Sequence, residues 1–127
     1  MIKTTIGEIL NVTPILRELL AKPFKGPITF KIARLIRELD KENSLFEESR
    51  ASLINKYGLR NDEGELIFSA EGAVKLQEDK ISDCNEELTN LLSTSVDINA
   101  ETIPIDAFEN IEISPAQAIV LETFIEY

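Results

Sequence analysis

Pairs of adjacent carboxylates are the main candidates for acid–base chemistry in this chain. They are Glu47/Glu48, Glu78/Asp79 and Glu86/Glu87. A general acid and a general base can act together when a cleft holds them within about 5–10 Å of each other. All three pairs, however, lie on segments with helical periodicity, where the polar face is expected to be charged and solvated. We therefore interpret them as solvated surface.

Other catalytic chemistries lack the residues they need. The chain has no histidine and one cysteine, Cys84, which excludes histidine-based triads and a four-ligand zinc site. The five glycines are scattered singly, so no phosphate-binding loop is present. The acidic turn that begins at Asp62 has Ala73 where an EF-hand requires glutamate. We therefore expect a protein that is not an enzyme and has no metal or cofactor.

Composition favours one globular core in a reducing compartment. Of the 127 residues, 43% are hydrophobic and 28% are charged, and no run approaches the roughly 20 apolar residues of a membrane span. A lone cysteine cannot form an intramolecular disulfide, and residues 1–10 lack the apolar stretch of a secretory signal. Cys84 lies at helical intervals from Ile81 and Leu88, which predicts a small core position. We expect a cytoplasmic protein.

Charge is divided unevenly along a chain whose net charge is -10. Residues 1–60 contain eleven Lys/Arg against seven Asp/Glu, a net charge of +4. Residues 61–127 contain two Lys/Arg against sixteen Asp/Glu, a net charge of -14, and no basic residue follows Lys80. Because opposite charges attract, we expect basic residues of the first half to neutralise part of the second, within the monomer or between subunits.

Two charged surfaces follow from this division. Basic residues recur at helical spacing at Lys31, Arg34, Arg37 and Lys41. Interleaved acids and a low aromatic content argue against direct nucleic-acid binding. The acidic second half could instead mimic nucleic acid and occupy a basic groove on another protein. The predicted acidic face consists of Asp79, Asp83, Glu86, Glu87, Asp97 and Glu101.

The elements expected before residue 60 are a strand and two helices. Residues 1–6 predict a strand, and Thr13 followed by Pro14 predicts a helix that starts there and ends near residue 22. From about 27 to 58, no internal proline or glycine interrupts a long helix. Its apolar residues repeat every seven positions, at Ile32, Leu39, Phe46 and Leu53. Polar positions near the middle, among them Asn43, are expected to fix register or to meet solvent.

The remaining elements complete a small mixed fold. Val74, Ile81 and Leu88 predict a second helix, at about 70–94, after a short strand at about 65–69. Apolar and polar residues alternate over 96–105, which predicts a strand or a strand pair. Ser114 begins a capping box for a helix at 115–126. No internal repeat is apparent. We predict one α+β domain over 1–127, with a long antiparallel helical hairpin, a small antiparallel sheet and short flanking N- and C-terminal helices.

Nine segments, taken in order, carry a resemblance over nearly the full length. They are FKIARLIREL (30–39), FEESR (46–50), LINKYG (53–58), NDEGEL (61–66), EELTNLL (86–92), VDI (96–98), IPI (103–105), ISP (113–115) and LETFIE (121–126). In this order the chain resembles small uncharacterised proteins of tailed bacteriophages and prophages. The resemblance implies a location in the cytoplasm of an infected bacterium or in the virion, and it carries over no catalytic residue.

These features predict a non-enzymatic interaction module that acts through helical contacts, in the virion or in its assembly. Its expected partner is a second copy or another phage protein, with neither nucleic acid nor a membrane bound directly. The expected partner contacts are Ile119, Val120, Phe124, Asp83, Glu86 and Glu87. The alternative is an acidic inhibitor of a host defence or nucleic-acid-handling protein, which would bind a basic host protein in a salt-sensitive complex.

Overall fold

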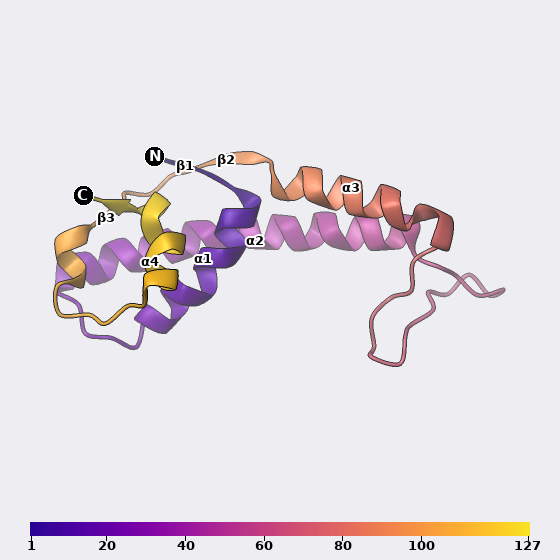
Figure 1. Cartoon of the computed structure of the whole chain (residues 1–127), viewed down its shortest axis with the longest axis horizontal. Coiled ribbons are helices and arrows are strands. Elements are labelled where there is room, and N and C mark those ends of the chain that lie inside the picture. Colours follow the sequence, from indigo (N-terminus) through magenta and orange to yellow (C-terminus); the bar gives the residue numbers. More distant parts are fainter. The chain divides into compact units, whose positions relative to one another are not determined.

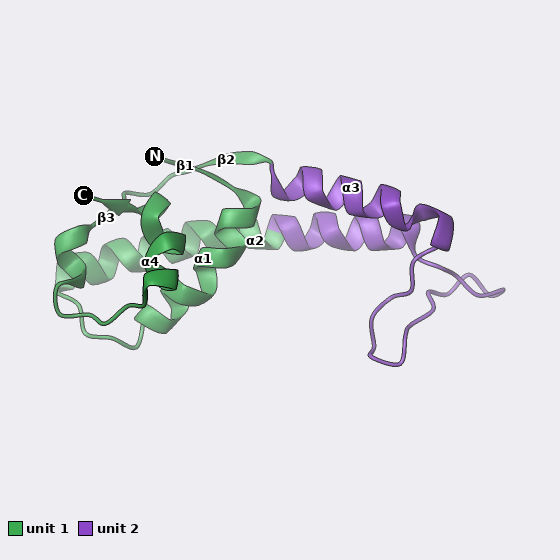
Figure 2. Ribbon diagram, in the orientation of Figure 1, with its two compact units in different colours: residues 1–44, 94–127 green, residues 45–93 purple.

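The computed structural model describes all residues, 1–127, and its contacts divide the chain into two compact units. Unit 1 contains residues 1–44 and 94–127, and unit 2 contains residues 45–93 (Figure 2). The longest helix, α2 (Gly26–Tyr57), contributes residues 26–44 to unit 1 and 45–57 to unit 2 (Figure 1). The mixture of helices and short strands confirms the predicted α+β class.

Unit 1 holds two small sheets. Strands β1 (Ile2–Thr5) and β2 (Ser95–Ile98) pair antiparallel, with Ile2 opposite Ile98. Strands β3 (Ile103–Pro104) and β4 (Ile125–Glu126) pair in parallel. The predicted strand segment 96–105 is therefore shared between two sheets. The predicted C-terminal helix is shorter than expected, because β4 follows α4 (Pro115–Leu121) and a 3-10 turn at Glu122–Phe124.

The first helix of unit 1 starts eight residues earlier than expected. Helix α1 (Ile6–Leu19) is capped by Thr5, whose hydroxyl accepts a hydrogen bond from the Glu8 backbone N–H at 3.2 Å. Pro14 lies inside the helix, so the prediction of a start at Thr13 was wrong. Burial of Ile6, Ile9 and Val12, at roughly 1.5–3 kcal/mol each, outweighs the roughly 3 kcal/mol cost of an interior proline.

The core of unit 1 is built from α1, α2, α4 and the strands. Its fully buried side chains are Ile9, Val12, Leu16, Ile32, Leu35, Leu39, Ile98, Ile103, Leu121 and Phe124. Asn43 of α2 donates a hydrogen bond to the Thr13 hydroxyl at 3.0 Å, and that hydroxyl donates to the Ile9 carbonyl at 2.7 Å. This polar contact, like the ion pair between Arg17 and Asp40, links α1 to α2. The capping box at Ser114 and Gln117 is confirmed, with both reciprocal hydrogen bonds present.

Unit 2 contains the predicted hairpin in a shortened form. Residues 45–57 of α2 and helix α3 (Ile81–Leu92), which follows a 3-10 turn at Glu78–Lys80, lie side by side (Figure 2). Hydrogen bonds from α2 to Glu87 of α3 join them. Cys84 is 6% exposed, which confirms its predicted core position. Few other side chains of unit 2 are buried, namely Phe46 and Tyr57.

Between these helices, residues 58–77 form three extended segments where a strand and the start of a helix were expected. The Ile67 N–H donates to the Leu59 carbonyl at 2.9 Å, the Leu59 N–H donates to the Lys75 carbonyl at 2.7 Å, and the Lys75 N–H donates to the Ile67 carbonyl at 2.8 Å. All three bonds are between backbone groups. Backbone hydrogen bonds therefore join the three segments in a closed ring. We call residues 58–77 the meander. Val74 lies in the meander, so its assignment to a helical seam with Ile81 and Leu88 was wrong.

Two similar turns shape the meander. Residues 61–64 (NDEG) and 69–72 (SAEG) each end in a glycine with positive φ, +81° at Gly64 and +83° at Gly72. In both turns the glycine N–H donates at 3.0 Å to the carbonyl of the first residue, Asn61 or Ser69. The two turns thus recur eight residues apart in the chain. A left-handed residue at position 72 cannot belong to an α-helix, which explains why no helix begins near residue 70.

Candidate interaction surfaces

The three apolar side chains expected to contact a partner differ in exposure. Ile119 on α4 is 73% exposed, whereas Val120 is half-buried and packs against the core of unit 1. Phe124 is fully buried, so its assignment as a partner contact was wrong. Its ring fills the core because the 3-10 turn after α4 directs residue 124 inward. Of the three, only Ile119 offers a large apolar surface.

The six predicted acidic residues are divided between the two units, and half of them form ion pairs. Asp79, Asp83, Glu86 and Glu87 belong to unit 2, and Asp97 and Glu101 belong to unit 1. The ion pairs are Asp83–Lys80 at 3.9 Å, Glu87–Lys56 at 3.1 Å and Glu101–Lys31 at 3.3 Å. The last two join a base from residues 1–60 to an acid from 61–127. They confirm the expected neutralisation within the monomer.

Glu87 serves as a clamp between the two helices of unit 2. Its Oε1 atom accepts hydrogen bonds from Lys56 Nζ at 3.1 Å and from the Tyr57 hydroxyl at 3.0 Å. The hydrogen bond from Lys56, followed by that from Tyr57, lowers the pKa of Glu87, and the same contact with Glu87 raises the pKa of Lys56. Lys56 Nζ also lies 4.9 Å from the centroid of the Tyr57 ring. These internal bonds leave Glu87 less available to a partner than exposed Glu86.

A line of side chains on α2 forms the most distinctive exposed surface of unit 1. It consists of Phe30, Arg34, Arg37 and Lys41, which we call the α2 strip. Intervals of four, three and four residues place them along one side of the helix. Phe30 is 77% exposed, and Arg34 and Arg37 are exposed without an ion-pair partner. Lys41 forms a surface pair with Glu38 at 2.9 Å.

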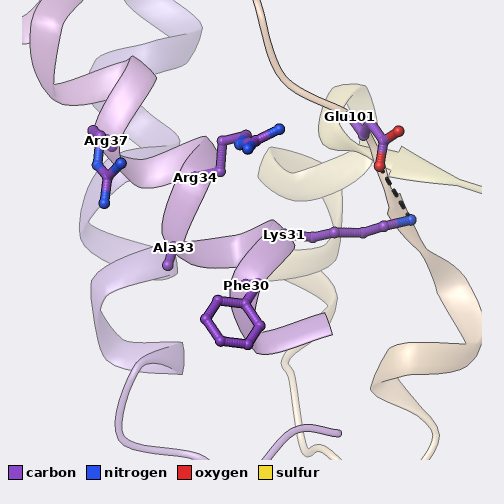
Figure 3. Close-up of a pocket in the computed structure, with 6 residues that line it drawn as sticks. All are labelled: Phe30, Lys31, Ala33, Arg34, Arg37 and Glu101. Atoms are coloured by element: carbon purple, nitrogen blue, oxygen red, sulfur yellow. Dashed lines mark ion pairs between the residues drawn. The ribbon is translucent and has the colours of Figure 1, made fainter. Parts of the chain in front are cut away.

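The first three members of the α2 strip line a shallow hollow of about 320 Å³ together with Ala33 and the Lys31–Glu101 pair. Figure 3 shows the Phe30 ring and the two guanidinium groups projecting from successive turns of α2. A guanidinium binds a carboxylate through two parallel hydrogen bonds, and an exposed aromatic ring offers apolar contact area. The hollow can therefore accept a carboxylate-bearing protein surface.

The sequence indicated the basic members of this line but did not indicate Phe30. An aromatic residue four positions before Arg34, on the polar side of an amphipathic helix, was the available signal. Lys31 was also predicted to belong to the line, but it pairs with Glu101 instead. The pairing of Lys31 leaves Arg34 and Arg37 as the free charges.

Neither a metal-binding cluster nor a membrane-spanning helix is present in the chain. No group of three or more His, Cys, Asp or Glu side chains is arranged to hold a metal ion. None of the helices is both long and apolar enough to cross a membrane. Comparison of the chain with protein-family models, curated proteins and solved structures found no match.

Proposed function

We propose that this chain is a non-enzymatic protein-interaction module with a structural or assembly role in a tailed bacteriophage, and that it binds its partner through the α2 strip. The observation that carries the proposal is the pair of unpaired guanidinium groups, Arg34 and Arg37, beside exposed Phe30 in a chain of net charge -10. Aromatic residues and arginine are enriched at the energetic centres of protein interfaces. The phage setting rests on the resemblance of the nine ordered segments.

A protein partner suits the α2 strip better than nucleic acid does. The strip has one aromatic side chain for stacking, and acids lie beside it at Glu38 and Asp40. The net charge of the chain would also repel a polyanion, whereas a protein can present two or three carboxylates on an otherwise uncharged surface. The expected partner is therefore a protein surface with a short line of acids.

The acidic inhibitor is a second candidate, supported by the absence of basic residues after Lys80. Asp79 and Glu86 are exposed and form no ion pair, so they could meet a basic partner. Three of the six predicted acids are already ion-paired, which reduces the charge available for this role. This candidate predicts that binding depends on Asp79 and Glu86 and does not depend on the α2 strip.

The test is capture of partners by the immobilised full-length protein from lysates of bacteria that carry the encoding phage or prophage. The double variant Arg34→Glu/Arg37→Glu should lose at least about tenfold of the captured partner, because like charges would then face each other. The matched control is Lys22→Glu/Lys25→Glu, which makes the same change in net charge at two exposed lysines without ion pairs.

Quantitative mass spectrometry of the captured proteins, including an untagged copy of this chain, gives the readout. Equal capture by the wild type and both double variants would contradict the proposal. Loss of capture only in Asp79→Asn/Glu86→Gln would favour the acidic inhibitor. Both outcomes assume folded variants, which far-UV circular dichroism would verify.

A further inference from the structure

We infer that the α2 strip binds the acidic side of α3 in a second copy of the chain, an inference that rests on the proposed function. The acidic side consists of Asp79 in the 3-10 turn before α3 and of Asp83 and Glu86 in α3. All three side chains are exposed. The charges of the two surfaces are opposite, and each copy presents both surfaces.

The spacing of the charges selects one relative direction of the helices. Read backward along α2, Lys41, Arg37 and Arg34 are separated by four and then three residues. Read forward, the acids Asp79, Asp83 and Glu86 are also separated by four and then three residues. In an antiparallel arrangement Arg37 therefore meets Asp83 and Arg34 meets Glu86, about 4.5 Å apart along the axis, and Lys41 lies toward Asp79 in the 3-10 turn before α3. A parallel arrangement reverses the order of the intervals, so that at most two of the three bases can meet an acid.

Ion pairs within the monomer compete only weakly for the side chains of these two surfaces. Arg34, Arg37 and Glu86 form no ion pair. Asp83 is 3.9 Å from Lys80, and Lys41 is 2.9 Å from Glu38, in surface pairs three residues apart. Exposed pairs of this kind contribute little, so exchanging them for contacts across an interface has a small cost.

The same register places Phe30 of one copy at the level of Asn90 in the other, beyond the last charge pair. An aromatic ring at the end of the line adds apolar contact area next to the Arg34–Glu86 pair and shields that pair from water. Each copy also carries a net charge of -10, which opposes association at long range. Pairs in contact lie well within the screening length of about 8 Å at physiological salt, so we expect weak, reversible association.

The test is a charge exchange measured by sedimentation equilibrium, from about 10 μM to about 1 mM chain, the range of weak association. The wild type should associate. The variant Arg34→Glu/Arg37→Glu and the variant Asp83→Arg/Glu86→Arg should each raise the Kd by at least about tenfold, because each places like charges together. An equimolar mixture of the two variants should associate again, because one exchanged strip then meets one exchanged acidic side.

The outcomes separate this inference from the proposed function. Failure of the mixture to associate, or association of the wild type that neither variant weakens, would overturn the pairing of these two surfaces. A wild type that stays monomeric up to 1 mM would also overturn it. In each case, strip-dependent capture of a different protein would leave the proposed function intact. Lys22→Glu/Lys25→Glu again serves as the control, and it should sediment as the wild type does.

Discussion

Unit 1 and unit 2 are stabilised in different ways. Unit 1 encloses a continuous set of fully buried apolar side chains, such as Leu16, Leu35 and Phe124. Unit 2 has few fully buried side chains; its apolar residues are mostly half-buried, and it also contains the backbone ring of the meander, two left-handed glycines and the Glu87 clamp. In unit 1 the buried apolar side chains outweigh a local irregularity such as Pro14 inside α1. In unit 2 the backbone hydrogen bonds of the meander depend on a few positions, such as Gly64 and Gly72. Unit 1 should therefore be most sensitive to the loss of buried apolar side chains, and unit 2 to changes at the few positions that hold its backbone geometry.

The largest loss in the free energy of unfolding is expected for a substitution in the core of unit 1. Leu16 is fully buried, so Leu16→Ala should reduce the free energy of unfolding by about 2–5 kcal/mol, through lost transfer energy and a residual cavity. The matched variant in unit 2, Leu88→Ala, removes a half-buried side chain and should cost less. Urea unfolding followed by circular dichroism measures both. Equal costs would refute the proposed difference between the units.

A smaller but more local effect is expected at Gly58, where the meander approaches α2. A methyl group there would lie 2.5 Å from Leu66 Cδ2 and 2.6 Å from the Ile54 carbonyl oxygen. Gly58→Ala should therefore cost about 1–3 kcal/mol through overpacking. Hydrogen exchange should accelerate at the amides of Leu59 and Ile67. Gly26→Ala has open space around it and is the control; acceleration spread equally over unit 1 would argue against two units.

The Glu87 clamp should make the stability of unit 2 depend on pH at both extremes. The lowered pKa of Glu87 gives stability that is present above the ordinary value of 4.5 and is lost as the pH falls through the folded value. The raised pKa of Lys56 gives stability that is present below 10.5 and is lost as the pH rises through the folded value.

Thermal unfolding of Glu87→Gln and wild type as a function of pH tests this prediction. The variant should be less stable at neutral pH, and the difference should shrink in strong acid, where wild-type Glu87 is protonated as well. Glu86→Gln changes an exposed neighbour without an ion pair and should follow the wild type throughout. A constant difference between Glu87→Gln and wild type at all pH values would exclude the clamp as its cause.

The smallest effect is expected at Ile119. This side chain is 73% exposed, so Ile119→Ser should change the free energy of unfolding by no more than about 0.5 kcal/mol. Chemical denaturation gives the value. A much larger loss would mean that Ile119 packs within the monomer, and it would no longer be a candidate partner contact.

Some elements could be predicted from the sequence because one strong local signal determines them. The long helix was predicted at 27–58 and lies at Gly26–Tyr57, since no internal proline or glycine competes with its apolar period. Ser114 and Gln117 likewise form their predicted capping box. The start of α1 was not predictable in this way, because Pro14 is a local signal for a helix start that burial overrides.

The remaining features depend on contacts between distant residues. The meander could have been predicted only by recognising that Gly64 and Gly72 occupy equivalent turn positions eight residues apart. The basic line on α2 was visible in the sequence, but which bases remain free was not, because Lys31 pairs with Glu101, seventy residues away. Phe124 and Ile119 were both predicted as contacts on one C-terminal helix, but the helix ends at Leu121 and Phe124 lies in the following 3-10 turn, where it is buried while Ile119 is exposed.

The most direct test of the central claim, that the α2 strip binds a protein and that this protein can be a second copy, is the solution mass by light scattering. The wild type and Arg34→Glu/Arg37→Glu would be compared at equal concentration in physiological salt. We predict a concentration-dependent mass above the monomer value of 14.3 kDa for the wild type and, at each concentration, a mass closer to 14.3 kDa for the variant. The same mass for both proteins at every concentration would contradict binding of a second copy through the α2 strip.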